Sequence, residues 1–287
     1  MELLFKTKKS LRDYLSKNSV GKSLGFVPTM GALHQGHLSL LKRARSENEL
    51  TLISIFVNPT QFNNAEDLEK YPNTLEEDLK LINEIAPSII VFSPSIEEMY
   101  QDQVHAKHYQ FEGIDLYLEG QDRPGHFDGV GTIVEALFNV IRPTRAYFGE
   151  KDFQQLLIVK SLVKQLQLPI EICSCPIVRE ENGLAMSSRN TRLTSEQQVR
   201  AAFIYDSLKL AVKLASELPA LEVKKKIELL YKNQNDFSLN YFEIVDVTHF
   251  QIVEEFLPNS YYRFLIAVEF HQLRLIDNIG YETHEVN

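Results

Sequence analysis

Residues 50–57 constrain the fold of this chain more than any other segment. They form an almost unbroken apolar run rich in β-branched residues, which is typical of a strand covered on both faces. A shorter apolar run, residues 23–27, comes before it, and we expect Pro28 to end that strand. Between the two runs, residues 36–48 carry apolar side chains at helical spacing. Strand, helix and strand in this order predict a parallel sheet with helices packed on its faces.

The same alternation continues to about residue 176. It predicts a helix over 74–85, a strand over 89–92, a helix over 130–141, a strand over 145–148, a helix over 153–165 and a strand over 170–173. We therefore expect a doubly wound, Rossmann-like α/β domain over residues 1–176. Residues 177–287 follow another pattern, in which two helices precede alternating segments typical of antiparallel strands. This pattern predicts a smaller C-terminal α+β domain, which we expect to act as a lid.

Charge and cysteine content exclude several classes of protein. The formal net charge of −9 argues against broad nucleic-acid binding, which depends on lysine and arginine. No apolar run reaches the ~20 residues of a membrane-spanning helix, and the N-terminus lacks the apolar core of a signal peptide, so we expect a cytoplasmic protein with no membrane partner. Cys173 and Cys175 lie one residue apart on a predicted strand, so we expect their side chains on opposite faces and no disulfide between them.

The turn after the first predicted strand carries two histidines around a glycine, in the order His34-Gln35-Gly36-His37. The N-terminus of a helix attracts anions, and a glycine there lets a nucleotide approach the backbone closely. Two imidazoles at this place can donate hydrogen bonds to phosphate oxygens as pyrophosphate departs. The ordinary structural explanation is a pair of histidines beside a turn. The position between a strand and a helix favours the phosphate site.

Two further segments suit a triphosphate. Lys151 follows the predicted strand 145–148, where its ammonium group can reach a phosphate, and Asp152 beside it can bind a ribose hydroxyl or cap a helix. The structural alternative is a cap with a solvated charge pair. Residues 186–189, Met-Ser-Ser-Arg, offer two hydroxyls and a guanidinium that can clamp the triphosphate from the other side. A loop that precedes a helix is the alternative there.

Three polar side chains are candidates for binding a second substrate. Gln61 and Gln155 each follow the carboxyl end of a predicted strand, where open α/β sheets bind ligands. Neutral amides suit a small substrate rich in hydroxyl groups. Arg123, with His126 nearby, is a candidate for an anion, and a structural role for this loop is equally open.

Five segments together resemble the pantoate–β-alanine ligase (pantothenate synthetase) family. They are residues 28–37 (PTMGALHQGH), 57–62 (VNPTQF), 123–127 (RPGHF), 148–155 (FGEKDFQQ) and 186–190 (MSSRN). The H-x-G-H part alone is shared with class I aminoacyl-tRNA synthetases and other nucleotidylyltransferases. The other segments are more specific, and they occur in the order of the family.

The resemblance implies a ligase of pantothenate biosynthesis, a precursor pathway of coenzyme A. It condenses (R)-pantoate with β-alanine, using ATP and Mg²⁺, through a pantoyl-adenylate, and it releases AMP and diphosphate. The family is dimeric, so the resemblance implies a homodimer; no protein residue is assigned as a metal ligand. Its catalytic residues match His37, His34 and Lys151, and its pantoate site matches Gln61 and Gln155, with Gln61 also by β-alanine. Its ATP-binding residues match Met30, Gly31, Ala32, Leu33, His34, Gln35, Gly36, His37, Gly149, Glu150, Lys151, Asp152, Val178, Met186, Ser187, Ser188 and Arg189.

Two other functions stay open from the sequence. One is a nucleotidylyltransferase that adenylates another small acceptor; a phosphorylated acceptor would call for extra lysine or arginine, whereas Gln61 and Gln155 favour a neutral polyol. The other is a catalytically idle nucleotide-binding module on the same fold, against which His34, His37 and Lys151 argue.

Overall fold

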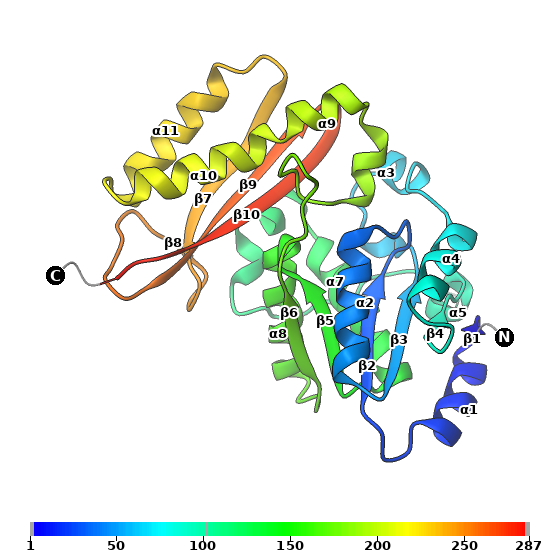
Figure 1. The fold of residues 1–287 in the computed structure, drawn as a ribbon. Helices are drawn as coiled ribbons and strands as arrows, with labels where there is room; N and C mark the ends of the chain where they lie inside the picture. The colour runs from blue at the N-terminus through cyan, green and yellow to red at the C-terminus, as the bar shows by residue number, and fades with distance from the viewer. Residues whose placement is uncertain (1–2, 102, 285–287) are drawn as a thin grey trace. The chain divides into compact units, whose positions relative to one another are not determined.

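The computed structural model describes residues 3–101 and 103–284, and the chain divides into two compact units, Met1–Val178 and Arg179–Asn287 (Figure 1). The first unit alternates strands and helices. Its elements are β1 (Leu3–Phe5), α1 (Lys8–Asn18), β2 (Leu24–Thr29), α2 (Gln35–Glu47), β3 (Leu50–Ile55), η1 (Pro59–Gln61), α3 (Ala65–Glu69), α4 (Leu75–Ile85), β4 (Ile90–Phe92), α5 (Ile96–Tyr100), η2 (Ile114–Leu116), α6 (Glu119–Asp122), α7 (His126–Ile141), β5 (Arg145–Gly149), η3 (Glu150–Asp152), α8 (Phe153–Gln165) and β6 (Glu171–Cys175).

The strands of the first unit form one parallel sheet in the order β1-β4-β3-β2-β5-β6. From β2 the chain winds outward through β3 and β4, and it then returns to the centre to place β5 on the other side of β2. The expected doubly wound, Rossmann-like fold is confirmed. The strand order reverses between β2 and β5, and ligands of open α/β sheets bind at the carboxyl ends of the strands at such a point.

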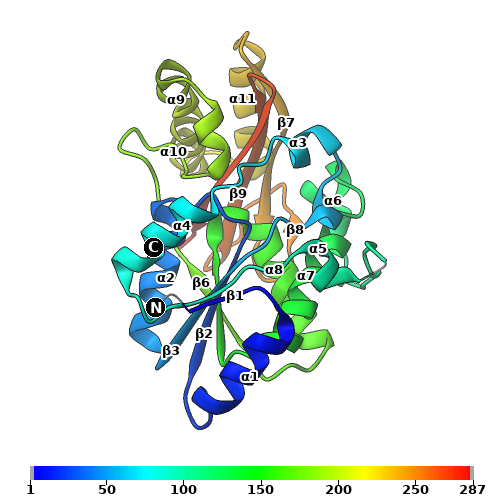
Figure 2. The same ribbon diagram turned by 90° about the vertical axis from the view of Figure 1, so that its right-hand side faces the viewer.

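Helices cover both faces of this sheet (Figure 2). On one face, α2 and α4 bury Leu41 and Ile82 against Val27, Ile53 and other side chains of the strands. On the other face, the ring of Phe26 meets that of Phe138 from α7 edge-on, with 6.2 Å between the ring centroids. The strands are therefore buried on both sides, which is why they read as continuous apolar runs.

Pro28 lies inside β2, so the expectation that it ends the strand is wrong. Alternate residues of a parallel strand bond to opposite neighbours: Thr29 accepts from Phe56 on the β3 side, and Leu24 accepts from Thr144 on the β5 side. Pro28 shares the side of Leu24, and the pairing of β2 with β5 ends at Phe26. The missing N–H of proline therefore removes no ladder bond, because β2 and β5 already diverge at this level.

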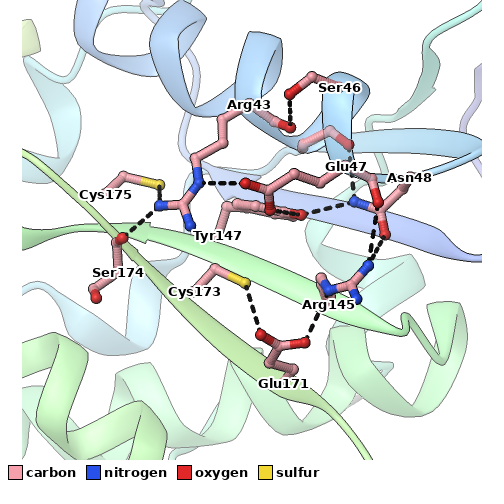
Figure 3. Close-up of polar contacts among 11 residues, drawn as sticks. Arg43, Ser46, Glu47, Asn48, Arg145, Tyr147, Glu171, Cys173, Ser174 and Cys175 are labelled. Carbon is pink, nitrogen blue, oxygen red and sulfur yellow. Dashed lines mark hydrogen bonds and ion pairs between the residues drawn. The ribbon is translucent and has the colours of Figure 1, made fainter.

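A polar network fixes α2 on β5 and β6 (Figure 3). Arg43 donates to the Ser174 carbonyl at 2.6 Å and to Glu47 at 2.8 Å, and the Tyr147 hydroxyl also donates to Glu47 at 2.8 Å. These two hydrogen bonds lower the pKa of the Glu47 carboxyl. The network sets the rotation of α2 and thereby the direction of its N-terminal turn.

The two cysteines are free thiols, and both are buried on the face of the sheet that α2 and α4 cover. The expectation of opposite faces for Cys173 and Cys175 is wrong, because side chains two positions apart on a strand point the same way. Helix α7 also begins earlier than expected, at His126 rather than near Val130, so the predicted loop of residues 121–129 ends in a helix N-terminus.

The second unit is an antiparallel sheet with helices on one face. Its elements are η4 (Ser188–Arg192), α9 (Ser195–Ala201), α10 (Phe203–Ala215), α11 (Ala220–Lys232), β7 (Phe237–Asp246), β8 (Gln251–Ile252), β9 (Tyr261–Phe270) and β10 (Leu273–Glu282), with strand order β10-β9-β7-β8. Leu208 of α10 and Val223 of α11 are buried with Phe264 and Ile266 of β9 in one core. This is the expected α+β architecture; its role as a lid stays a prediction. Among the described residues, no helix is long and apolar enough to cross a membrane.

Candidate active site

The turn that follows β2 has an unusual backbone. Gly31 and Ala32 both lie in the left-handed region, with φ of 84° and 50°. Glycine adopts such a φ without strain, but alanine does so only at a cost that its surroundings must offset. Thr29 contributes by accepting from the Gly31 N–H at 3.3 Å while donating to the Ser54 carbonyl at 2.7 Å.

Asp78 of α4 holds this turn from the other side. Its two carboxylate oxygens accept from the backbone N–H groups of Ala32 at 3.0 Å and Leu33 at 2.7 Å, and its side chain is buried. The sequence pattern predicted a helix over residues 74–85 but did not identify Asp78 as part of the site. The available signal was its position one helical turn before Ile82, which places it on the buried face of α4.

Both histidine side chains accept hydrogen bonds from backbone N–H groups at the start of α2. His34 caps α2, and its Nδ1 accepts from the Gly36 N–H at 3.1 Å. The Nδ1 of His37 accepts from the His34 N–H at 3.4 Å, and the ring centroids are 4.1 Å apart. Because each Nδ1 accepts, a neutral ring carries its proton on Nε2. Both imidazoles thus present an Nε2–H donor.

Burial keeps these two imidazoles neutral. Burial, followed by the charge of Lys151, lowers the pKa of His34 to about 4. Burial, followed by the neighbouring His34, lowers the pKa of His37 to about 3. Near pH 7 the pair therefore offers donors without a formal charge.

Lys151 and Asp152 lie on η3, directly after β5. The Lys151 Nζ is 3.6 Å from a carboxylate oxygen of Asp152. Both charges act on the pKa values of His34 and His37, with Lys151 lowering and Asp152 raising them. The structure thus brings the β2 and β5 segments together at the reversal of strand order, where the sequence predicted a phosphate site.

Gln61 lies beside the same turn. It ends η1, and its side-chain amide donates to the Met30 sulfur at 3.1 Å and accepts from the Asn58 amide at 3.1 Å. Asn58 is buried. Arg123 and His126 contact Gln61 through its backbone carbonyl, with N–O distances of 3.3 and 2.8 Å.

Two adjacent glutamines at the start of α8 have different surroundings. Gln154 is buried; it accepts from the Glu119 N–H at 3.1 Å and donates to the carbonyls of Ile114 and Tyr117 at 2.7 and 2.8 Å. Gln155 is half-buried, and within the described part of the chain its side chain makes no hydrogen bond. Gln154 thus organises the 114–119 segment, whereas the amide of Gln155 is available to a ligand.

The remaining predicted residues lie at the junction of the units and beyond it. Val178 is half-buried at the end of the first unit. In the second unit, the Ser187 hydroxyl accepts from the Arg189 N–H at 3.3 Å, and the buried Asn190 donates to the Ala185 carbonyl at 3.0 Å. The segment 186–189 is thus internally ordered, and its clamp on a triphosphate stays a prediction.

The described residues contain no group of three or more His, Cys, Asp or Glu side chains that could hold a metal ion. A doubly wound sheet with two imidazoles and a lysine at its point of reversal defines a nucleotide-binding enzyme of the Rossmann-like class. The family model of pantoate-beta-alanine ligase matches residues 3–280. The chain belongs to the pantoate-beta-alanine ligase family, which is a family of ligases.

Similar proteins cover nearly the whole chain. The pantothenate synthetase of Flavobacterium psychrophilum is 51% identical, over 90% of this chain and 92% of its own. That of Aquifex aeolicus is 46% identical, over 97% and 98% of the two chains. The crystal structure of pantothenate synthetase from Thermus thermophilus matches with a TM-score of 0.89 at 38% identity, covering 99% of this chain and 100% of that one. Pantoate-beta-alanine ligase from Francisella tularensis, solved with beta-gamma ATP and β-alanine, matches with a TM-score of 0.79 at 35% identity, over 97% of each chain.

Proposed function

We propose that this protein condenses (R)-pantoate with β-alanine at the expense of ATP. The observation that carries the proposal is the pair of neutral imidazoles, His34 and His37, at the point of strand reversal, where burial and the charge of Lys151 lower the pKa of both rings. Family membership supports the choice of substrates, as does the Francisella tularensis relative solved with beta-gamma ATP and β-alanine.

The first step forms an acyl-adenylate. A carboxylate oxygen of pantoate attacks the α-phosphorus of ATP, and the bond between that phosphorus and the bridging oxygen breaks to release diphosphate. Negative charge grows on the phosphate oxygens during this step, and fixed donors there stabilise it more than water does. His37 and His34 supply two such donors, and Lys151 adds a positive charge.

The second step forms the amide. The neutral amine of β-alanine attacks the acyl carbon of the adenylate, AMP leaves with the electrons of the broken C–O bond, and the amine loses a proton. A mixed anhydride is needed because a free carboxylate has no adequate leaving group. Since water would hydrolyse the anhydride, exclusion of solvent is required; we assign it to the second unit, acting with Val178 and residues Met186, Ser187, Ser188 and Arg189.

Neutral amides explain how pantoate is held while it stays reactive. Gln61 and Gln155 can hydrogen bond to the hydroxyl groups of pantoate without neutralising its carboxylate. A guanidinium paired with that carboxylate would stabilise its charge and lower its nucleophilicity. The side chain of Gln155 suits this role because it makes no hydrogen bond within the described part of the chain.

Mg²⁺ enters this scheme with ATP as part of the substrate. The ion prefers oxygen ligands and usually keeps several waters beside phosphates and one or two carboxylates. Glu150 and Asp152, the two acids of η3, would be the carboxylates of the proposed ATP site that could supply such a ligand. The bound ion would neutralise charge on the departing diphosphate.

Isotope exchange between ATP and diphosphate tests the proposed function. Labelled diphosphate should enter ATP when pantoate is present and β-alanine absent. Without the amine the second step cannot occur, and reversal of the first step returns the label to ATP. Exchange without pantoate, or exchange that requires a different acceptor, would contradict the proposal and favour a nucleotidylyltransferase.

A further inference from the structure

Two side chains converge on the backbone carbonyl of Gln61. The Nδ1 of His126 lies 2.8 Å from this oxygen, and a terminal nitrogen of Arg123 lies 3.3 Å from it. His126 is 6% exposed, so its hydrogen bond is sheltered from water. The carbonyl of Gln61 is thus held by donors from α7 and from the residue that follows α6.

The contacts of His126 define its tautomer. Because Nδ1 donates to a carbonyl, it carries the proton, and Nε2 has a lone pair. The other terminal nitrogen of Arg123 lies 3.2 Å from Nε2 and donates to it. Burial and the neighbouring guanidinium lower the pKa of His126 to about 4, so the ring stays neutral near pH 7. Arg123 therefore orients the imidazole that orients Gln61.

The start of α7 braces η1 at two more points. The Asn58 amide, which also donates to the Gln61 side chain, donates to the Gly129 carbonyl at 3.1 Å. A Cβ on Gly129 would lie only 2.2 Å from the Thr60 carbonyl oxygen, so the two segments touch backbone to backbone. These contacts restrict the movement of the η1 backbone that carries Gln61.

We propose that His126 is a positioning residue for the second substrate: it fixes the peptide of Gln61 so that the side-chain amide faces pantoate, and Arg123 acts through this contact. The inference rests on the proposed function, since it assumes that Gln61 binds pantoate. The ring nitrogens of His126 bond to the Gln61 carbonyl and to Arg123, and neither of these residues is assigned to the ATP site. Loss of His126 therefore weakens pantoate binding and leaves ATP binding unchanged.

Three substitutions at one position separate positioning from packing. His126→Ala removes the donor. His126→Asn keeps an N–H close to the place of the imidazole Nδ1, whereas His126→Gln carries its amide out toward the place of Nε2. His108→Ala is the matched control, because that imidazole bonds to Asp128 of the same helix and is 80% exposed.

The measurement is pantoate-dependent exchange between ATP and diphosphate, with KM for each substrate and the thermal midpoint of each variant. His126→Ala and His126→Gln should raise KM for pantoate about tenfold, as expected for one lost hydrogen bond, while KM for ATP stays within about twofold. His126→Asn should restore most of the loss, and His108→Ala should behave as the unaltered protein.

Three results would overturn the inference while the unaltered protein stays active. The first two are an unchanged KM for pantoate in His126→Ala and equal increases in both KM values. The third is an equal KM for pantoate in His126→Asn and His126→Gln. Only the Asn variant keeps an N–H at the place of Nδ1, so a positioning role predicts different KM values, whereas a packing role does not. Absence of pantoate-dependent exchange in the unaltered protein would instead refute the proposed function, and the inference with it.

Discussion

The carboxylate of Asp78 accepts a hydrogen bond from the backbone N–H of Leu33 at 2.7 Å, across 45 positions of sequence. A second bond, from Ala32 at 3.0 Å, makes the same side chain a clamp on the turn that leads to His34. The turn includes a non-glycine residue with positive φ, and such a backbone persists only where its surroundings enforce it. The direction of the two imidazoles therefore depends on a side chain of α4.

Replacement of Asp78 by alanine should destabilise the first unit. The buried N–H of Leu33 and the partly buried N–H of Ala32 would lose their acceptor, at a cost of about 2–4 kcal/mol of unfolding free energy. Urea denaturation measures the loss, with Glu77→Ala as control because Glu77 is an exposed acid of the same helix. Equal stabilities of the two variants would show that the clamp contributes nothing.

The adjacent glutamines of α8 should respond in opposite ways. Gln154→Ala leaves one backbone N–H and two carbonyls without their partner, so we expect a lower thermal midpoint. Gln155→Ala removes no hydrogen bond of the Gln155 side chain, so the unfolding free energy should change by less than about 0.5 kcal/mol. The KM for pantoate should rise in this variant. A destabilised Gln155→Ala together with a stable Gln154→Ala of raised KM for pantoate would contradict this assignment of roles.

His37→Ala and Lys151→Ala should each lower turnover by about a hundredfold or more, as does the loss of one transition-state donor elsewhere. The reduction should appear in the exchange reaction as well as in pantothenate formation, because both residues are assigned to the first step. Near-normal rates in both variants would remove them from the site.

Stability should fall on mild acidification. The pKa values of His34, His37 and His126 are lowered from 6.5 to about 4, 3 and 4 in the fold. As the pH falls from about 6.5 toward 4, the unfolded chain binds protons that the folded chain does not, so the unfolded state gains. His37→Gln removes one of these groups and should flatten the dependence of the urea midpoint on pH. His108, whose pKa Asp128 raises, acts in the opposite direction in both proteins, so it cancels in this comparison. An equally steep dependence in the variant would contradict the assignment.

Local pattern sufficed for much of the fold, whereas the phosphate site stays a prediction. Apolar runs identified the central strands, and the structure confirms that His34 lies between a strand and a helix, because both features depend on neighbours in sequence. Pro28 was misjudged because its tolerance depends on which neighbouring strand its missing N–H would face, which local sequence does not report. The pairing of β5 with β2, rather than with β4 that precedes it along the chain, is likewise a property of topology.

The supporting residues of the site were harder to find. Asp78 and Gln154 act through backbone groups that lie tens of residues away, and nothing in their own segments announces those partners. Periodicity could have placed Asp78 on a buried face, where an acid needs a partner. For Arg123 the sequence left an anion-binding role and a structural role equally open. The structure shows contacts to the Gln61 carbonyl and to His126, and an anion at Arg123 stays a prediction.

The central claim, that pantoate is activated as an adenylate, is tested most directly by following oxygen. Pantoate labelled with ¹⁸O in both carboxylate oxygens is converted with ATP and β-alanine, and the products are analysed by mass spectrometry. The account predicts one labelled oxygen in the phosphate of AMP and the other in the amide carbonyl of pantothenate. Unlabelled AMP would contradict it, because the carboxylate oxygen would then never have bonded to the α-phosphorus.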